Sequence, residues 1–182
     1  MTENEKRMHR ACFTGHRPEK LMRSENAIRK DLEKQIRQAV TDGLNVFISG
    51  MARGVDIWAT QIVLKLRNEG TDVKLICACP YKGFELGWSR EWQQQYKEVL
   101  ESADFIKYVC ADYSRACFQI RNEWMVNHAV RVIAIFNGEK GGTKNTMDYA
   151  AKIGVPVVNK RKPDSNRGTH RAEIVVRFWC EW

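Results

Sequence analysis

The chain has 182 residues, of which 43% are hydrophobic and 29% are charged. This composition is ordinary for one globular domain with a sizeable core, and no apolar stretch approaches the roughly 20 residues that a membrane-spanning helix needs. The first residues are mostly polar or charged and have no apolar segment behind them, which argues against a signal peptide. We therefore expect a cytoplasmic protein with no membrane partner.

The net charge of +8 favours anionic partners but does not identify one. Many of the basic residues gather in two segments, residues 29–37 and 160–171. A solvent-exposed face explains both segments most simply, and a nucleic-acid footprint is the alternative interpretation.

The six cysteines and four histidines show neither a Cys-x-x-Cys pair nor the ligand spacing of a zinc site. In a cytosolic chain, such cysteines are expected to be small buried hydrophobic residues. We therefore predict neither a disulfide nor a metal site.

The first predicted strand covers residues 10–13 and opens onto a polar loop at residues 14–18. Because the proline in this loop disfavours a direct continuation into a helix, its polar side chains are expected at the carboxyl end of the strand. A helix is then predicted from the N-cap residue Ser24 to Gly43.

The second predicted strand, residues 45–48, runs into a glycine-rich turn at residues 49–56 and a helix that continues to Gly70. Gly50 and Gly54 let the backbone turn sharply and expose amide N–H groups at the start of the helix, where the helix dipole attracts phosphate or carboxylate. The spacing is that of neither the P-loop nor the dinucleotide-binding fingerprint, and we assign no cofactor. A tight turn without a ligand is the alternative interpretation.

The alternation of strands and helices continues to the end of the chain. Further strands are predicted at residues 72–79, 104–109, 131–136 and 155–158, with helical stripes from Trp88 to Leu100 and from Cys117 to His128. A second glycine-rich turn covers residues 137–146, where Thr143 is expected to cap the next helix. A polar linker follows, and residues 172–182 are predicted to form a final strand at an antiparallel edge.

This arrangement predicts a single α/β domain with an open, mostly parallel sheet and right-handed crossovers. In such sheets ligands bind beyond the carboxyl ends of the strands, at the switch point of the strand order. Both glycine-rich turns and the loop at residues 14–18 fall at carboxyl ends. Their agreement predicts a site for a phosphate-bearing ligand.

Five segments in this order resemble the YpsA family, which lies within the SLOG superfamily together with the DNA-processing protein DprA (SMF) and the LOG nucleotide hydrolases. The segments are Thr14-Gly15-His16-Arg17-Pro18, Gly50-Met51-Ala52-Arg53-Gly54-Val55-Asp56-Ile57-Trp58-Ala59, Pro80-Tyr81, Arg121-Asn122-Glu123-Trp124-Met125-Val126 and Gly141-Gly142-Thr143-Lys144-Asn145-Thr146. The resemblance covers about residues 10–159.

The resemblance implies a Rossmann-like fold with helices on both faces of the sheet and a pocket for a nucleotide or a nucleotide-derived ligand. The ligand classes are ADP-ribose, NAD and mononucleotides, and the implied role is that of a sensor or adaptor. The ligand-binding residues that follow from it are Thr14, Gly15, His16, Arg17, Gly50, Met51, Arg53, Gly54, Asp56, Arg121, Asn122, Gly141, Gly142 and Thr143. The last three are expected to cradle a phosphate.

The same resemblance bears on catalysis. LOG hydrolases, which are nucleoside monophosphate phosphoribohydrolases, use an Arg in Arg-x-x-x-Met and a Glu in Gly-Gly-x-Gly-Thr-x-x-Glu. The first pattern is matched by Arg121 and Met125, but Thr146 stands where the Glu is expected. Threonine cannot stabilise an oxocarbenium-like charge or activate water as a carboxylate does. We therefore favour a binding protein over an enzyme, with Asp56 and Arg121 as the candidate catalytic residues of the alternative.

DprA proteins carry a similar Ser-Gly-x-Ala-x-Gly-x-Asp turn and an Arg-Asn pair, and they bind single-stranded DNA. The positive charge is compatible with such a partner, but the aromatic residues fall mostly on helical stripes, whereas single-strand binding uses exposed rings. Single-stranded nucleic acid is therefore the second candidate partner. Related families often pair, and the predicted final strand offers an edge for a homodimer.

Overall fold

The structure is a computed structural model that describes residues 1–159, so the predicted linker and antiparallel edge strand at residues 160–182 lie outside the described residues. The helices are α1 (Glu3–Arg7), the short 3₁₀ helix η1 (Pro18–Lys20), α2 (Glu25–Thr41), α3 (Val55–Asn68), α4 (Arg90–Ser102), α5 (Cys117–Asn127) and α6 (Gly142–Lys152). The strands are β1 (Arg10–Gly15), β2 (Val46–Ser49), β3 (Lys74–Cys79), β4 (Phe105–Tyr108), β5 (Arg131–Ile135) and β6 (Val157–Asn159).

The six strands form one sheet in the order β4-β3-β2-β1-β5-β6, and every neighbouring pair is parallel. The chain moves outward from β1 to β4 and then returns across the sheet to β5. The order therefore reverses between β1 and β5, which is where open α/β sheets bind their ligands. The predicted mostly parallel α/β sheet is confirmed.

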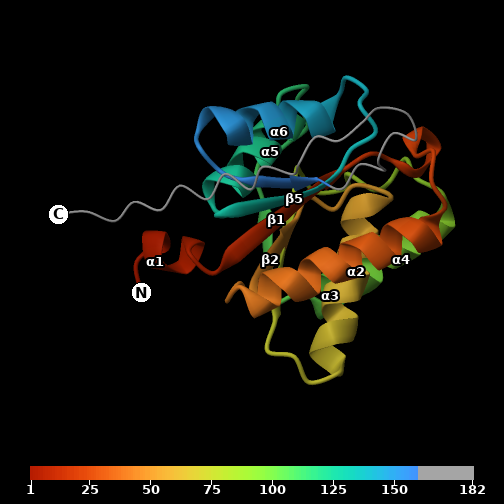
Figure 1. The fold of residues 1–182 in the computed structure, drawn as a ribbon. Helices are drawn as coiled ribbons and strands as arrows, with labels where there is room; N and C mark the ends of the chain where they lie inside the picture. Colours follow the sequence, from red (N-terminus) through yellow and green to blue (C-terminus); the bar gives the residue numbers. More distant parts are fainter. Residues whose placement is uncertain (160–182) are drawn as a thin grey trace, which may run out of the picture.

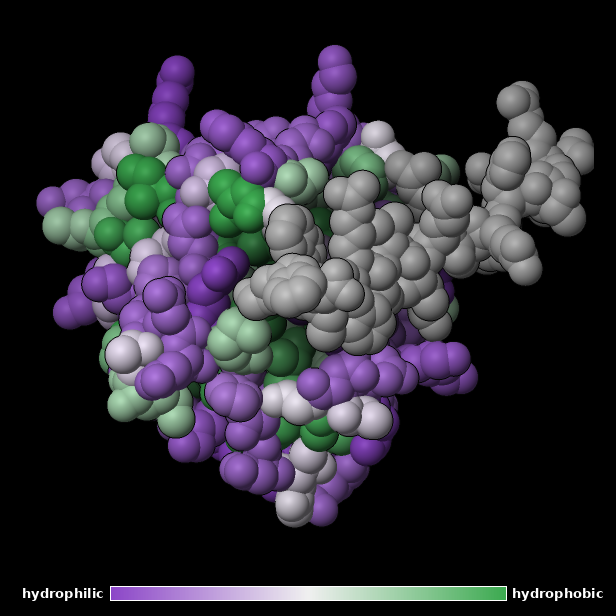
Figure 2. Space-filling model, turned by 60° about the vertical axis from the view of Figure 1, so that its left-hand side comes forward, coloured by the Kyte–Doolittle hydropathy of each residue, from purple (hydrophilic) through white to green (hydrophobic). Residues whose placement is uncertain are grey.

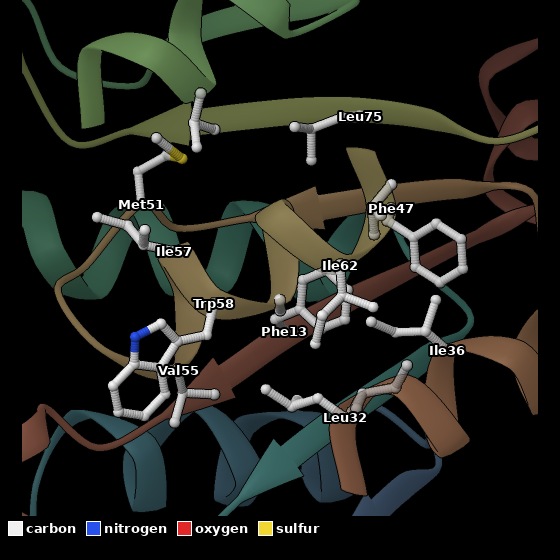
Figure 3. Close-up of a cluster of buried hydrophobic side chains, with 14 of the residues drawn as sticks. Phe13, Leu32, Ile36, Phe47, Met51, Val55, Ile57, Trp58, Ile62 and Leu75 are labelled. Carbon is white, nitrogen blue, oxygen red and sulfur yellow. The ribbon is translucent and has the colours of Figure 1, made fainter. Parts of the chain in front are cut away.

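Helices cover both faces of the sheet, as predicted. Figure 1 shows α5 and α6 on one face and α2, α3 and α4 on the other. The larger apolar cluster lies under α2 and α3, where the rings of Phe13 and Phe47 stack with centroids 5.8 Å apart (Figure 3). A smaller cluster under α5 and α6 includes Ile48 and Met125. The central strands are buried on both faces, which explains their continuous apolar runs.

The surface follows the usual pattern of a globular domain. On the face turned forward in Figure 2, hydrophilic residues predominate and hydrophobic residues form small separate patches. Among the described residues, no helix has both the length and the apolar character that crossing a membrane requires.

Helix α1 was not predicted from the sequence, although its start signal is present there. The hydroxyl of Thr2 accepts from the Glu5 N–H at 3.3 Å, and the Glu5 carboxylate accepts from the Thr2 N–H at 2.6 Å. This reciprocal pair is a capping box, whose Thr-x-x-Glu pattern can be read from a sequence.

Two predicted helices differ from the structure. Helix α4 begins at Arg90, so Trp88 precedes it and packs against Phe84 with ring centroids 4.9 Å apart. In α5 the predicted stripe ran through Ile120, but that side chain is 45% exposed and Arg121 and Met125 face inward instead. The hydrophobic periodicity of the sequence did not identify this inward face, because two of its buried residues, Arg121 and Asn122, are polar.

The close approach of β1 and α3 depends on Gly15. A Cβ atom at this position would overlap the side chain of Val55, the first residue of α3. Gly15→Ala must therefore displace the start of α3, and we expect it to lower the free energy of unfolding by about 1–3 kcal/mol or more. Gly87→Ala is the matched control, because a Cβ there meets open space and should change stability by less than about 0.5 kcal/mol. Equal losses in urea unfolding would contradict this account.

Candidate functional site

A cavity with a volume of about 360 Å³ opens at the carboxyl ends of the strands, within the size range of small-molecule sites. Ten of the residues predicted to bind the ligand line it: Thr14, Gly15, His16, Arg17, Asp56, Arg121, Asn122, Gly141, Gly142 and Thr143. The three predicted loops thus meet around one space. Whether these residues bind a ligand stays a prediction.

Four other predicted residues, Gly50, Met51, Arg53 and Gly54, are not among the residues that line the cavity. Gly54 lies instead where the turn after β2 packs against the loop after β1. Its φ is +89°, and a Cβ atom would lie 2.8 Å from Pro18 Cδ and 3.1 Å from the carbonyl oxygen of His16. The turn after β2 therefore touches the loop after β1 backbone to backbone, which only glycine permits in this conformation.

Gly50 and Met51 form the support beneath the cavity. The Arg121 guanidinium occupies the space where a Cβ of Gly50 would project, and its Nη1 donates to the Gly50 carbonyl oxygen. Met51 is fully buried with a φ of 60°. Its N–H donates to the Ser49 hydroxyl at 3.1 Å, and that hydroxyl donates to the Asp56 carbonyl oxygen at 3.3 Å. These bonds fix the path of the turn.

Arg121 is a buried cation, with only 6% of its surface exposed. Besides Gly50, its Nε donates to Asn122 Oδ1 at 2.9 Å. Burial lowers the pKa of the guanidinium, and the neighbouring charge of Asp56 acts in the opposite direction. Because a buried charge is costly unless it is paired and hydrogen-bonded, these partners explain how an arginine can line the cavity.

Asp56 is the buried carboxylate of the site. Its Oδ2 accepts from the Ala52 N–H at 3.2 Å, whereas its buried Oδ1 has no hydrogen-bond partner among the described residues. Burial raises the pKa of Asp56 to about 6, against the opposing effects of the Arg121 charge and the Ala52 N–H. At neutral pH the group is therefore mostly ionised and able to accept a further hydrogen bond.

His16 presents a second unpartnered atom. Its side chain is buried, its ring stacks on Phe136 with centroids 5.4 Å apart, and Nε2 lacks a hydrogen-bond partner among the described residues. Burial lowers the pKa of this imidazole, so it is neutral at pH 7. A neutral ring nitrogen can donate or accept, depending on the tautomer.

The start of α6 differs from the prediction at one residue. Gly141, with a φ of 149°, is the N-cap, the helix begins at Gly142, and no side chain caps it. The prediction that Thr143 is the cap is therefore wrong, because Thr143 lies inside the first turn. It is buried and lines the cavity, next to first-turn amides that lack helical partners.

Sequence reasoning missed six residues that line the cavity: Glu19, Lys20, Ala52, Phe84, Phe118 and Met125. Met125 was noted only as part of the Arg-x-x-x-Met pattern. The two phenylalanines follow β3 and β4, so their positions at carboxyl ends were the available signal. No group of three or more His, Cys, Asp or Glu side chains within residues 1–159 is arranged to hold a metal ion.

Three cationic residues near the rim are paired with carboxylates. Arg53 Nη2 lies 3.2 Å from Glu19 Oε1, and Lys144 Nζ lies 2.6 Å from Asp148 Oδ2. Lys20 Nζ lies 4.0 Å from Glu139 Oε2. Arg17 also lines the cavity, and this exposed cation has no ion pair among residues 1–159.

The model of the YpsA family, described as the YspA SLOG family, matches residues 11–154. The chain belongs to the YpsA family.

This YpsA-family chain is similar to two Bacillus proteins. The uncharacterized SPbeta prophage-derived protein YoqJ of Bacillus subtilis (strain 168) is 35% identical over 118 residues, which cover 58% of this chain and 69% of YoqJ. A UPF0398 protein of Bacillus thuringiensis (strain Al Hakam) is 29% identical over 150 residues, which cover 78% of this chain and 81% of the relative.

Solved structures of DNA processing protein A share the fold. The protein from Helicobacter pylori, described for its single-stranded DNA binding mode, gives a TM-score of 0.62 at 19% identity and covers 90% of this chain and 71% of that one. DprA from Streptococcus pneumoniae gives 0.61 at 20% identity, covering 84% of this chain and 50% of that one. At these identities the likeness concerns the fold alone.

The interaction of Arg121 with Asp56 predicts a pH-dependent loss of stability. Removing the Arg121 charge raises the pKa of Asp56 further above its usual value of 3.8. When the pKa of a carboxyl group is higher in the folded state than in the unfolded state, the free energy of unfolding falls as pH rises from the unfolded-state pKa to the folded-state pKa. The reason is that the unfolded state ionises more readily over this pH range. Arg121→Gln should therefore lower the free energy of unfolding by about 1–3 kcal/mol near pH 8, where buried acceptors lose their donor and Asp56 loses a nearby cation, and by clearly less near pH 5.

Urea unfolding at both pH values measures this difference. Arg37→Gln is the control, because Arg37 is half exposed and pairs with Glu33 at the surface. Surface pairs are screened by solvent and contribute little to stability, so the control should show little loss at either pH. The same loss for Arg121→Gln at both pH values would contradict the coupling.

Proposed function

We propose that this protein binds a nucleotide or a nucleotide-derived ligand in the cavity at the carboxyl ends of β1, β2 and β5. The observation that carries the proposal is the meeting of three loops around one cavity that contains both the uncapped start of α6 and the buried cation Arg121. An anion is the ligand that satisfies both features.

The start of α6 suits a phosphate. Its first-turn N–H groups have no helical partners, and the dipole of the helix places positive potential there. Gly141 and Gly142 carry no side chains, so a phosphate can approach the backbone closely. Thr143 adds a hydroxyl on the same turn.

The arrangement gives less support to LOG-type hydrolysis. Thr146, which replaces the expected Glu, is fully buried and donates its hydroxyl to the Gly142 carbonyl oxygen at 2.8 Å. It is therefore engaged within its own helix and is not among the cavity-lining residues. We infer a sensor or adaptor role in the cytoplasm, in which occupancy of the cavity is the signal.

Binding can be tested by isothermal titration calorimetry against AMP, ADP, ADP-ribose and NAD. We expect at least one of them to bind with a dissociation constant in the micromolar range. Gly142→Glu should weaken that binding at least tenfold, because it adds a negative charge where the phosphate is expected. A glutamate in the first turn is favourable for the helix, so the variant should fold.

Gly87→Glu is the matched control for this experiment. It introduces the same charge at an exposed position outside the cavity, where a Cβ atom meets open space. The proposal fails if no ligand of the panel binds below millimolar concentration, or if both variants weaken binding equally.

Single-stranded DNA is the second candidate ligand, favoured by the fold shared with DprA and by the net charge of +8. Against it, the rim cations Arg53, Lys144 and Lys20 already face carboxylates, which leaves Arg17 as the cavity-lining exposed cation without an ion pair among residues 1–159. We therefore expect no retarded complex with a labelled single strand in a gel-shift assay at low salt. A complex whose affinity falls steeply over a salt series would contradict this expectation, because each neutralised phosphate releases counterion.

A further inference from the structure

The cavity has an aromatic end that the proposed function does not yet use. Phe84 and Phe118 line it, with ring centroids 5.7 Å apart. Both rings also contact Tyr81, at 5.9 Å and 6.3 Å between centroids, so their positions are fixed by ring packing. A ring that is held in place and faces a cavity can contact the flat face of another ring.

Helix α5 connects this aromatic end to the start of α6. Phe118 lies one helical turn before Asn122, and the Asn122 side-chain nitrogen would lie 3.8 Å from a Cβ atom of Gly142. The aromatic rings and the start of α6 therefore line one cavity of about 360 Å³. A nucleotide carries both a flat base and a phosphate and can contact both groups, whereas inorganic phosphate or a free base cannot.

Asp56, in the first turn of α3, lines the same cavity. Its Oδ1 is buried and has no hydrogen-bond partner among residues 1–159. An unpartnered buried carboxylate oxygen is costly, so it indicates a donor that the protein itself does not supply. The sugar hydroxyls of a nucleotide are such donors, and carboxylates recognise ribose hydroxyls in dinucleotide-binding folds.

We propose that the cavity selects ribonucleotides, with the base against Phe84 and Phe118, a ribose hydroxyl donating to Asp56 Oδ1, and the phosphates at the start of α6. This inference rests on the proposed function and goes further in naming the sugar and the orientation. The unpartnered Nε2 of His16, on the neighbouring loop after β1, is available to the sugar or the first phosphate.

The sugar is tested on the wild-type protein by calorimetry with ADP and GDP, each beside its 2′-deoxy and 3′-deoxy analogues. We expect one of the two deoxy forms to bind at least tenfold more weakly than the parent nucleotide, since losing a hydrogen bond to a buried charge is costly. In Asp56→Asn this difference should fall below about threefold. If Asp56→Asn does not fold, the affinities of the wild-type protein for the ribo- and deoxynucleotides decide by themselves whether the cavity selects ribose.

The orientation is tested with ribose 5-phosphate and Phe118→Leu. This variant should weaken ADP binding about tenfold, because base–aromatic stacking is lost, and leave ribose 5-phosphate binding unchanged. Phe105→Leu is the control, since Phe105 is 54% exposed on β4 and does not line the cavity. Equal weakening of both ligands would overturn the proposed orientation.

The results distinguish a failure of ribose selection from a failure of nucleotide binding. Equal affinities for ribo- and deoxynucleotides would overturn ribose selection while the nucleotide-binding function stands. Absence of binding by every nucleotide would overturn both.

Discussion

Arg121 Nη1 donates to the carbonyl oxygen of Gly50, and this bond joins helix α5 to the turn after β2 across the carboxyl edge of the sheet. The guanidinium fits there only because residue 50 has no side chain. The same cation lies beside Asp56, whose Oδ2 accepts from Ala52 and so shapes the rest of the turn. The floor of the cavity therefore contains two buried charged side chains of opposite sign, Arg121 and Asp56.

This construction explains why the site is a cavity and not part of the core. A buried guanidinium and a buried carboxylate need partners on several sides, and apolar neighbours cannot supply them. The protein supplies some partners through Gly50, Ala52 and Asn122. It leaves Asp56 Oδ1 and His16 Nε2 without one among the described residues. The described residues thus satisfy the polar floor of the cavity only in part.

Most of the fold could be predicted from the sequence because local signals and topology agree. The apolar run at residues 131–136 and the N-cap Ser24 each identify an element, and β5 and α2 follow them closely. Since parallel strands bring their carboxyl ends to one edge, the three loops of the site could also be predicted to meet.

The remaining details depend on contacts that no local pattern contains. The partner of Arg121 lies 71 residues earlier in the chain, so the inward face of α5 could not be recognised from its apolar residues. Phe84 and Phe118 both pack on Tyr81, and these ring contacts join the segment after β3 to α5, which no local pattern could reveal. The N-cap of α6 is Gly141 rather than Thr143, because the backbone conformation there, not a side-chain hydroxyl, starts the helix.

The contact at Gly54 has a mechanical consequence. The turn after β2 and the loop after β1 touch there through backbone atoms, so neither can move inward without moving the other. The two loops form one wall of the cavity. The opposite wall consists of aromatic side chains and is more exposed, because Phe118 is only partly buried and its neighbour Tyr113 is 62% exposed. The cavity therefore presents closely packed loop backbone on one side and side chains on the other.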